Sequence, residues 1–322
     1  MEQRNPKLHP QVQKFLSEMP SISAGQIWDT PVSEFRNLFE QMATSQVAEK
    51  VPVNSVTTLS IPGPAGLIET RIYDPLSLEG SEKQNFPLLV YFHGGGHVVG
   101  SLDSHDSVAR FLCAEAGCVV ASVDYRLAPE NKFPAAIEDG YAATKWLANN
   151  CQSMGYGSGP LIIAGDSAGG NIAAVVALLA RDDKDGPKID FQILFYPVTD
   201  YSCSSNSYEF FSTGYGGLTK ERMRWFQSYY LPDNSYADDW RASPLKAPDL
   251  SRLPKTLIIT AECDVLHDEG AEYAKALQKM GCEVEYLDWP GMIHGFIGSA
   301  AIFDEGKAAL RLTTHRIKEI TM

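Results

Sequence analysis

Apolar residues follow two different patterns along the chain. Near the N-terminus they recur every three or four residues, in Val12–Met19 and again in Phe35–Met42, which predicts two amphipathic helices. Each helix has one apolar face and no neighbouring strand in the sequence to cover it. We therefore expect this segment to form a lid over a functional site built later in the chain, with packing on the outer helices of a sheet as the alternative.

From Val56 onward the pattern is typical of strands. Residues 68–73 alternate between apolar and polar, as in a strand with one buried face, whereas 88–92 and 118–123 are continuously apolar, as in strands buried on both faces. Further strands are expected at 161–164, 193–196, 256–260 and 284–287, and helices at 107–116, 134–149, 269–280 and 303–320. Because strands and helices alternate, we expect an α/β fold with a mostly parallel central sheet flanked by helices.

Residues 199–243 interrupt this alternation. They are rich in Tyr, Phe, Trp, Gly and Ser and predict no strand. We expect an N-terminal helical cap segment at 1–52, a main α/β domain formed by 53–198 and 244–322, and an insertion at 199–243 that contributes to the same cap.

Composition narrows the class. The net charge of −13 argues against nucleic-acid binding, because an acidic surface repels phosphate. Six cysteines without a Cys-x-x-Cys pair are expected to be reduced, packed thiols rather than metal ligands or a disulfide scaffold. The first residues are polar and no apolar run is long enough to span a bilayer, so we expect a cytoplasmic protein without stable membrane insertion.

One segment organises the rest of the sequence. An apolar run leads into Gly165-Asp166-Ser167-Ala168-Gly169 and a second apolar run follows, which predicts a strand, a sharp turn and a helix. Glycines flank the serine because only residues without a β-carbon let the two arms pass closely. Such a turn holds the hydroxyl of Ser167 out of the sheet, as a nucleophile requires; a glycine turn in the core is the alternative.

Ligands collect at the carboxyl ends of the strands in an open α/β sheet, so the segments that follow the strands are expected to meet there. The first of these is His93-Gly94-Gly95-Gly96-His97. Consecutive glycines leave backbone N–H groups uncovered, suited to stabilising an oxyanion together with the N–H of Ala168. A phosphate-binding loop would be followed by Lys or Ser/Thr, whereas residues 98–100 are Val, Val and Gly.

The second segment, residues 261–270, contains four carboxylates. Asp264, just past a strand, is favoured as the acid that orients a catalytic histidine. Asp268 and Glu269 are expected in the first turn of the next helix, where the helix dipole favours acids. Asp288, after the last strand, is a weaker candidate.

The third segment supplies the histidine, His294, and the chain order Ser167, Asp264, His294 is that of an α/β-hydrolase. From about residue 87 to 296 the chain resembles the short-chain carboxylesterases of the hormone-sensitive-lipase family (bacterial family IV), in the branch with Gly-Asp-Ser-Ala-Gly. The resemblance rests on five motifs: 93–96 (HGGG), 125–130 (YRLAPE), 165–170 (GDSAGG), 264–270 (DVLHDEG) and 294–296 (HGF).

The resemblance implies an α/β-hydrolase fold with a helical cap and a serine carboxylesterase that cleaves short- to medium-chain acyl esters through an acyl-enzyme. It implies Ser167 as nucleophile, His294 as base and Asp264 as its orienting acid. The oxyanion donors would be Gly95, Gly96 and Ala168, with His93 and Gly94 shaping the loop. No metal and no organic cofactor is expected, and the partner is a small-molecule ester.

Several other residues near the motifs are expected to have structural roles. Arg126 and Glu130 are expected to form an ion pair or anchor a loop. Family members often carry a bulky aromatic residue where this chain has His97, which we expect to donate a hydrogen bond to a backbone carbonyl rather than act as a second titrating group. Asp103 and His105 are expected to be structural.

Alternatives remain within the same fold. An amidase or deacetylase acting on a small metabolite would use the same triad, and a lipase would be distinguished by activation at an interface. A non-catalytic ligand-binding receptor is disfavoured because such receptors lack the catalytic histidine. Exposed edge strands would permit a homodimer.

Overall fold

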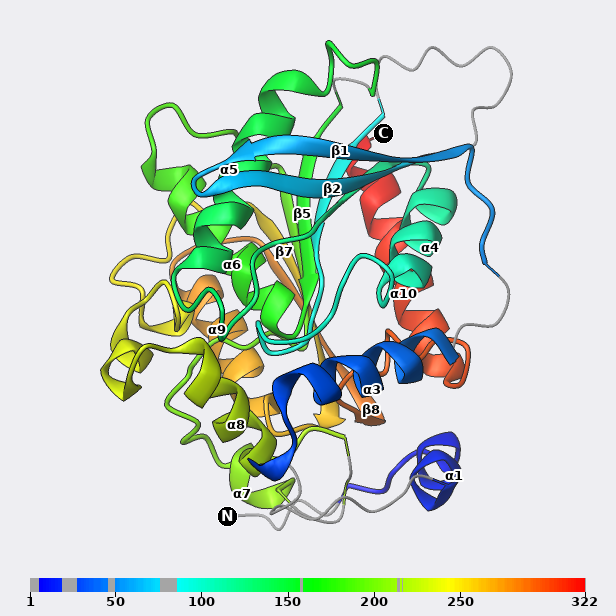
Figure 1. The fold of residues 1–322 in the computed structure, drawn as a ribbon, viewed down its shortest axis with the longest axis vertical. Coiled ribbons are helices and arrows are strands. Elements are labelled where there is room, and N and C mark those ends of the chain that lie inside the picture. The colour runs from blue at the N-terminus through cyan, green and yellow to red at the C-terminus, as the bar shows by residue number, and fades with distance from the viewer. Residues whose placement is uncertain are drawn as a thin grey trace.

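The continuous apolar runs form the inner strands of one eight-stranded sheet in the computed structural model of the chain (Figure 1). The structure describes residues 6–18, 28–45, 50–75, 86–156, 159–212, 215 and 217–321. Every residue is buried in β3 (Leu88–Phe92), β4 (Val119–Val123), β5 (Leu161–Asp166) and β6 (Phe191–Phe195). These strands are apolar throughout because helices cover both faces of the sheet, and the predicted α/β class is confirmed.

The strand order is β1-β2-β4-β3-β5-β6-β7-β8. Strands β3 to β8 pair in parallel, with β7 at Lys255–Cys263 and β8 at Val284–Ile293. The chain moves from β3 to β4 on one side and then crosses to β5 on the other side of β3. This reversal creates a crevice at the carboxyl ends of β3 and β5, which is where open α/β sheets bind ligands.

An antiparallel hairpin completes the sheet at one edge. It consists of β1 (Ser55–Gly63) and β2 (Gly66–Asp74), and β2 pairs antiparallel with β4. Most of β1 is partly or fully exposed, whereas β2 buries Ile68, Thr70 and Ile72 and exposes Glu69 between them, which confirms the alternation predicted for 68–73.

Helices cover the two faces of the sheet unequally. One face carries α4 (Asp106–Ala116) and α10 (Asp304–Thr321), and the other carries α5 (Ala135–Asn150), α6 (Ala168–Asp182) and α9 (His267–Lys279) (Figure 1). Helix α6 is apolar on nearly all sides and almost entirely buried, because it lies between the sheet and other helices.

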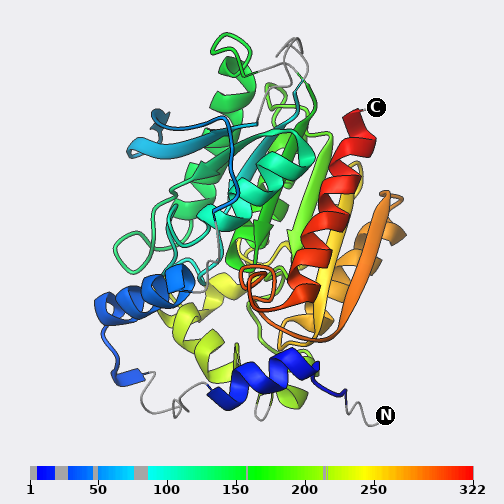
Figure 2. The ribbon, with the colours of Figure 1, turned by 90° about the vertical axis from the view of Figure 1, so that its right-hand side faces the viewer.

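The remaining helices gather beyond the carboxyl ends of the strands. They are α1 (Pro10–Glu18), α3 (Val32–Ser45), α7 (Ser207–Phe210) and α8 (Lys220–Tyr230) (Figure 2). The short 3₁₀ turns η2 (Asn234–Asp238) and η3 (Pro244–Lys246) follow α8 in the chain, and η3 contacts α6 and α9. The Phe35 ring on α3 lies 4.9 Å from the Trp225 ring on α8, so the N-terminal segment and the 199–243 segment touch. Met19 and residues 1–5 lie outside the described residues.

Several predicted boundaries were wrong for local reasons. Strand β6 ends at Phe195 because Tyr196 adopts a φ of 35°, which breaks the extended backbone. Pro134 precedes α5 as its N-cap instead of lying in its first turn. Strand β8 continues to Ile293 through an irregularity in its pairing with β7, so His294 follows it directly.

All six cysteines are free thiols, as expected. In the described part of the chain, no helix combines the length and apolar character needed to cross a bilayer.

The buried Asn171 on α6 forms hydrogen bonds at both ends of the 199–243 segment. Its side-chain amide donates to the carbonyls of Val198, at 2.9 Å, and Ala242, at 2.7 Å. We expect Asn171→Ala to lower the free energy of unfolding by about 2–4 kcal/mol, because two buried carbonyls lose their donor. Urea denaturation tests this. The control Asn150→Ala, which removes one partly buried bond within α5, should cost about 1 kcal/mol or less; equal losses would contradict the prediction.

Candidate active site

Ser167 occupies a strained turn between β5 and α6. Its φ of 56° and ψ of −118° lie outside the favoured regions for a residue with a side chain, and its N–H donates to the Phe195 carbonyl at 2.9 Å. A β-carbon on Gly165 would collide with the carbonyl of Gly169, and one on Gly169 would collide with that of Phe92. The flanking glycines are therefore required by the close passage of strand and helix.

Three strands bring the predicted nucleophile, base and acid together. His294 Nε2 lies 2.9 Å from Ser167 Oγ, and His294 Nδ1 lies 2.6 Å from Asp264 Oδ2. A carboxylate only accepts hydrogen bonds, so Nδ1 carries the proton and Nε2 presents its lone pair to the serine hydroxyl. This arrangement can remove the hydroxyl proton as Oγ attacks an electrophilic carbon.

Two other candidate acids have partners of their own. Glu262 accepts from the N–H of Gly291 at 2.8 Å, and Asp288 lies 3.3 Å from His267 Nε2. Asp264 is 1% exposed, and its second oxygen accepts from the N–H of Leu266. The four-carboxylate segment thus presents a single acid to His294.

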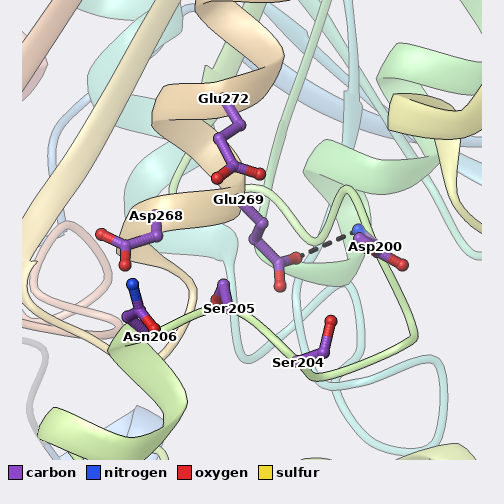
Figure 3. Close-up of a pocket in the computed structure, with 7 residues that line it drawn as sticks. All are labelled: Asp200, Ser204, Ser205, Asn206, Asp268, Glu269 and Glu272. Atoms are coloured by element: carbon purple, nitrogen blue, oxygen red, sulfur yellow. Dashed lines mark hydrogen bonds between the residues drawn. The ribbon is translucent and has the colours of Figure 1, made fainter.

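Asp268 and Glu269 begin α9, as predicted, and line a separate polar pocket with Asp200 and Glu272 (Figure 3). Glu269 accepts from the N–H groups of Thr199, at 2.8 Å, and Asp200, at 3.2 Å. Its burial raises the pKa of this carboxyl well above the usual range. Glu269 therefore anchors the start of the 199–243 segment and does not contact His294.

In the glycine loop after β3, two N–H groups point to the side opposite the hydrogen-bonded carbonyls of the loop. The N–H and the preceding C=O of one peptide plane point in opposite directions. The Gly94 carbonyl accepts from His93 Nδ1 at 2.8 Å, so the N–H of Gly95 points the other way. The Gly95 carbonyl accepts from Val98 and Val99 at 3.0 and 2.9 Å, which orients the N–H of Gly96 in the same manner.

The N–H of Ala168 is the first of α6 and so has no acceptor within that helix. Within the described ranges, the N–H groups of Gly95, Gly96 and Ala168 have no hydrogen-bond acceptor. Unpaired amides beside a serine and a helix N-terminus suit a developing negative charge.

His93 itself is buried beneath the loop. Desolvation lowers its pKa to about 3, so the imidazole is neutral at ordinary pH. Tyr125 Oη donates to the His93 carbonyl at 2.7 Å, and the two rings stack with centroids 4.4 Å apart. The loop therefore rests on a rigid, uncharged support.

Asp166 has a positioning role that the sequence analysis missed. Its Oδ1 accepts from the N–H of Gly94 at 2.9 Å and from Tyr91 Oη at 2.6 Å, which joins the turn at Ser167 to the glycine loop. Burial raises the pKa of this carboxyl, but nearby His105 and the hydrogen bond from Tyr91 outweigh it and lower the pKa overall. An acid at the end of a fully buried strand needs such partners, and this is the signal that could have revealed them.

The prediction for His97 was wrong. Its ring is fully buried and stacks on Tyr230 of α8 at 3.8 Å, and neither ring nitrogen has a hydrogen-bond partner within the described ranges. Burial lowers its pKa to about 3, so it carries no charge at neutral pH. Its backbone carbonyl, not its side chain, makes the local bond, accepting from the N–H of Ala128 at 2.8 Å.

The other nearby charged residues form ion pairs. Arg126 forms a two-bond pair with Asp139 of α5, and Glu130 forms one with Arg36 of α3. Asp103 binds Arg71 at 2.8 Å. The described part of the chain contains no group of three or more His, Cys, Asp or Glu residues placed to hold a metal ion.

Known hydrolases are similar to this chain in sequence. The profile of a family described as "alpha/beta hydrolase fold" matches residues 89–298. The carboxylic ester hydrolase LipN of Mycobacterium tuberculosis is 44% identical over 274 residues, which cover 81% of this chain and 71% of LipN. An ethyl acetate hydrolase of Pseudomonas putida is 33% identical, with 89% of each chain covered.

Solved structures of esterases are also similar to this chain. A hyperthermophilic esterase from the archaeon Pyrobaculum calidifontis has a TM-score of 0.89 and 40% identity, covering 97% of this chain and 98% of its own. A thermostable esterase from Pseudomonas putida has a TM-score of 0.90 and 33% identity, with 99% of each chain covered.

The ion cluster around the buried His267 makes stability depend on pH. His267 lies 2.8 Å from Asp268 and 3.3 Å from Asp288. Although burial lowers its pKa, these carboxylates raise it to about 9. A raised pKa stabilises the fold fully below the unfolded value near 6.5, and this contribution is lost as the pH rises through about 9.

We therefore expect His267→Gln to lower the free energy of unfolding by on the order of 1–3 kcal/mol at pH 6 and by much less at pH 10. Urea denaturation at both pH values measures this. The exposed His315 provides the control, since His315→Gln should cost little at either pH. An equal cost of His267→Gln at pH 6 and pH 10 would rule out the electrostatic account.

Proposed function

The chain belongs to the α/β-hydrolase family, in its hormone-sensitive-lipase-like group, and is a carboxylic ester hydrolase; from this premise we propose that it hydrolyses short- to medium-chain acyl esters through a Ser167-His294-Asp264 triad. The observation that carries the proposal is the continuous hydrogen-bond chain from Ser167 Oγ through both nitrogens of His294 to Asp264. The sequence at 165–169 favours the Gly-Asp-Ser-Ala-Gly branch of this group.

In the proposed acylation, Ser167 Oγ forms a bond to the ester carbonyl carbon while His294 Nε2 takes the hydroxyl proton. The carbonyl electron pair moves onto oxygen, and this oxyanion accepts from the N–H groups of Gly95, Gly96 and Ala168. Asp264 stabilises the positive imidazolium. When the intermediate collapses, the bond to the alcohol oxygen breaks and His294 returns its proton to that oxygen.

Water then repeats the sequence on the acyl-enzyme. His294 Nε2 removes a proton from the water as its oxygen attacks the acyl carbon, and the same three N–H groups hold the second oxyanion. Collapse releases the carboxylic acid and restores the Ser167 hydroxyl with the proton from His294. Every step uses groups of this chain and water.

We propose that residues 1–52 and 199–243 form a cap over this site and that residues 53–198 and 244–322 form the catalytic domain. Contacts between α3 and α8 support this division. So does Phe226 of α8, because a β-carbon on Gly96 would collide with its ring. A buried aromatic ring against an oxyanion donor leaves little room for the acyl chain, which favours short substrates.

The free thiols support a reducing compartment, and we propose that the protein is cytoplasmic.

Replacing members of the triad tests the assignment. We expect Ser167→Ala to reduce kcat on p-nitrophenyl butyrate by at least about 10⁴-fold, and Asp264→Asn by about 10³–10⁴-fold. Asp288→Asn is the matched control, since this acid contacts His267 and Thr260 rather than His294, and kcat should stay within the same order of magnitude. Comparable losses for the two Asp variants, or a Ser167→Ala variant with more than a few per cent of the activity, would refute it.

Phe226 provides a test of acyl-chain preference. Removing its ring should open space beside Gly96, so Phe226→Ala should raise the kcat/KM ratio of p-nitrophenyl hexanoate to acetate by about tenfold, which corresponds to burial of about two more methylenes at about 0.8 kcal/mol each. Phe210→Ala removes an exposed ring from the same inserted segment and should leave the ratio unchanged. The explanation fails if both variants keep the wild-type ratio.

A further inference from the structure

Arg36 of helix α3 makes four hydrogen bonds at the edge of the glycine loop. Its Nε donates to the carbonyl of Val98, and its Nη2 to the carbonyl of Ala128, both at 2.8 Å. The two remaining bonds, at 2.9 and 2.7 Å, go to the carboxylate of Glu130. A helix of the proposed cap is therefore bonded to the backbone of the loop that carries the proposed oxyanion donors.

These bonds hold two consecutive peptides, His97–Val98 and Val98–Val99. The N–H of Ala128 donates to the His97 carbonyl at 2.8 Å, so the loop at 126–130 holds the residue before Val98 while Arg36 holds Val98 itself. Because Arg36 also binds the Ala128 carbonyl, the guanidinium links the two segments into one unit.

The two held peptides control the orientation of the N–H of Gly96. The N–H groups of Val98 and Val99 donate to the Gly95 carbonyl, and this carbonyl lies in the same peptide plane as the N–H of Gly96. A shift of Val98 would let the Gly95 carbonyl rotate, and the N–H of Gly96 would rotate with it. Arg36 is thus connected to the proposed oxyanion hole through the hydrogen-bonded turn at residues 95–99.

Glu130 fixes the guanidinium in this position. The planar guanidinium matches a carboxylate in a two-bond geometry that a lysine cannot reproduce. Hydrogen bonding to Arg36 is the main cause that lowers the pKa of Glu130, so the pair is charged at neutral pH. Glu130 is largely exposed, and an exposed ion pair contributes little to stability, which leaves orientation as the main effect of the pair.

A second contact from the cap reaches the same loop. Phe35, next to Arg36 on α3, packs against Trp225 and Phe226 of α8, and the Phe226 ring lies against Gly96. Helix α3 therefore contacts the loop directly through Arg36 and indirectly through α8.

We propose that Arg36 is a positioning residue for catalysis, which orients the N–H of Gly96 from the cap and so sets the strength of the oxyanion hole. The proposal rests on the proposed function, because it assigns Arg36 an effect on that same site. If the proposal is right, loss of Arg36 weakens binding of the transition state more than binding of the ester.

The test compares Arg36→Met with Arg316→Met in the full chain. Arg316 lies on α10 and forms an equivalent two-bond pair with Glu285, and the two arginine side chains are 29% and 30% exposed. The control therefore removes the same charge and the same type of ion pair away from the loop. Each variant is assayed for kcat and KM on p-nitrophenyl butyrate and for inhibition by an alkyl trifluoromethyl ketone, whose adduct with the serine carries an oxyanion.

We expect Arg36→Met to lower kcat by about 10- to 100-fold, less than the 10²–10³-fold typical for loss of an oxyanion donor, with KM changed by less than about threefold. The inhibition constant for the ketone should rise by the same factor as kcat falls. Arg36→Lys, which can bind only part of this set of acceptors, should fall between wild type and Arg36→Met. Arg316→Met should behave as wild type in all three measurements.

The proposal is overturned if Arg36→Met matches Arg316→Met in kcat and ketone inhibition, or if only KM rises. If Arg36→Met does not fold, Arg36→Lys decides, and wild-type kcat and inhibition in that variant contradict the proposal. Failure of the proposed function looks different, because then wild type itself neither hydrolyses the ester nor binds the ketone.

Discussion

The strained backbone of Ser167 is the constraint on which the site depends. The turn between β5 and α6 is so tight that Gly169 lies against the end of β3, where a β-carbon would collide with the carbonyls of Phe92 and His93. This close approach brings the start of the glycine loop next to the serine and the first N–H of α6. The same turn exposes the hydroxyl to His294. The nucleophile, the base and the unpaired amides therefore lie together at the carboxyl ends of β3 and β5, where the strand order reverses.

The orientation of the loop amides follows from hydrogen bonds on the opposite side of each peptide. His93 holds the Gly94 carbonyl, and the Val98 and Val99 amides hold that of Gly95. Asp166 fixes the start of the loop and Arg36 its far end. The loop amides are therefore oriented by the neutral His93 ring, two backbone amides, the Asp166 carboxylate and one arginine from the proposed cap.

The fold could be predicted because inner parallel strands are apolar along their whole length, and because the carboxyl ends of such strands meet at one edge. These rules also placed Ser167, Asp264 and His294 near one another. They could not reveal the bond between Gly94 and Asp166, which are 72 residues apart and meet only through the pairing of β3 with β5. The stack of His97 on Tyr230 could not be predicted for a similar reason, because Tyr230 lies in a segment whose sequence shows no strand or helix periodicity.

The central claim is that Ser167 forms a covalent acyl intermediate, and a p-nitrophenyl alkylphosphonate tests it most directly. This reagent phosphonylates an activated serine and releases p-nitrophenolate, and the adduct can be located by mass spectrometry of the intact protein and its peptides. The account predicts one equivalent of nitrophenolate and a single adduct on Ser167. A folded protein that gains no adduct, or gains it on another residue, would contradict the account.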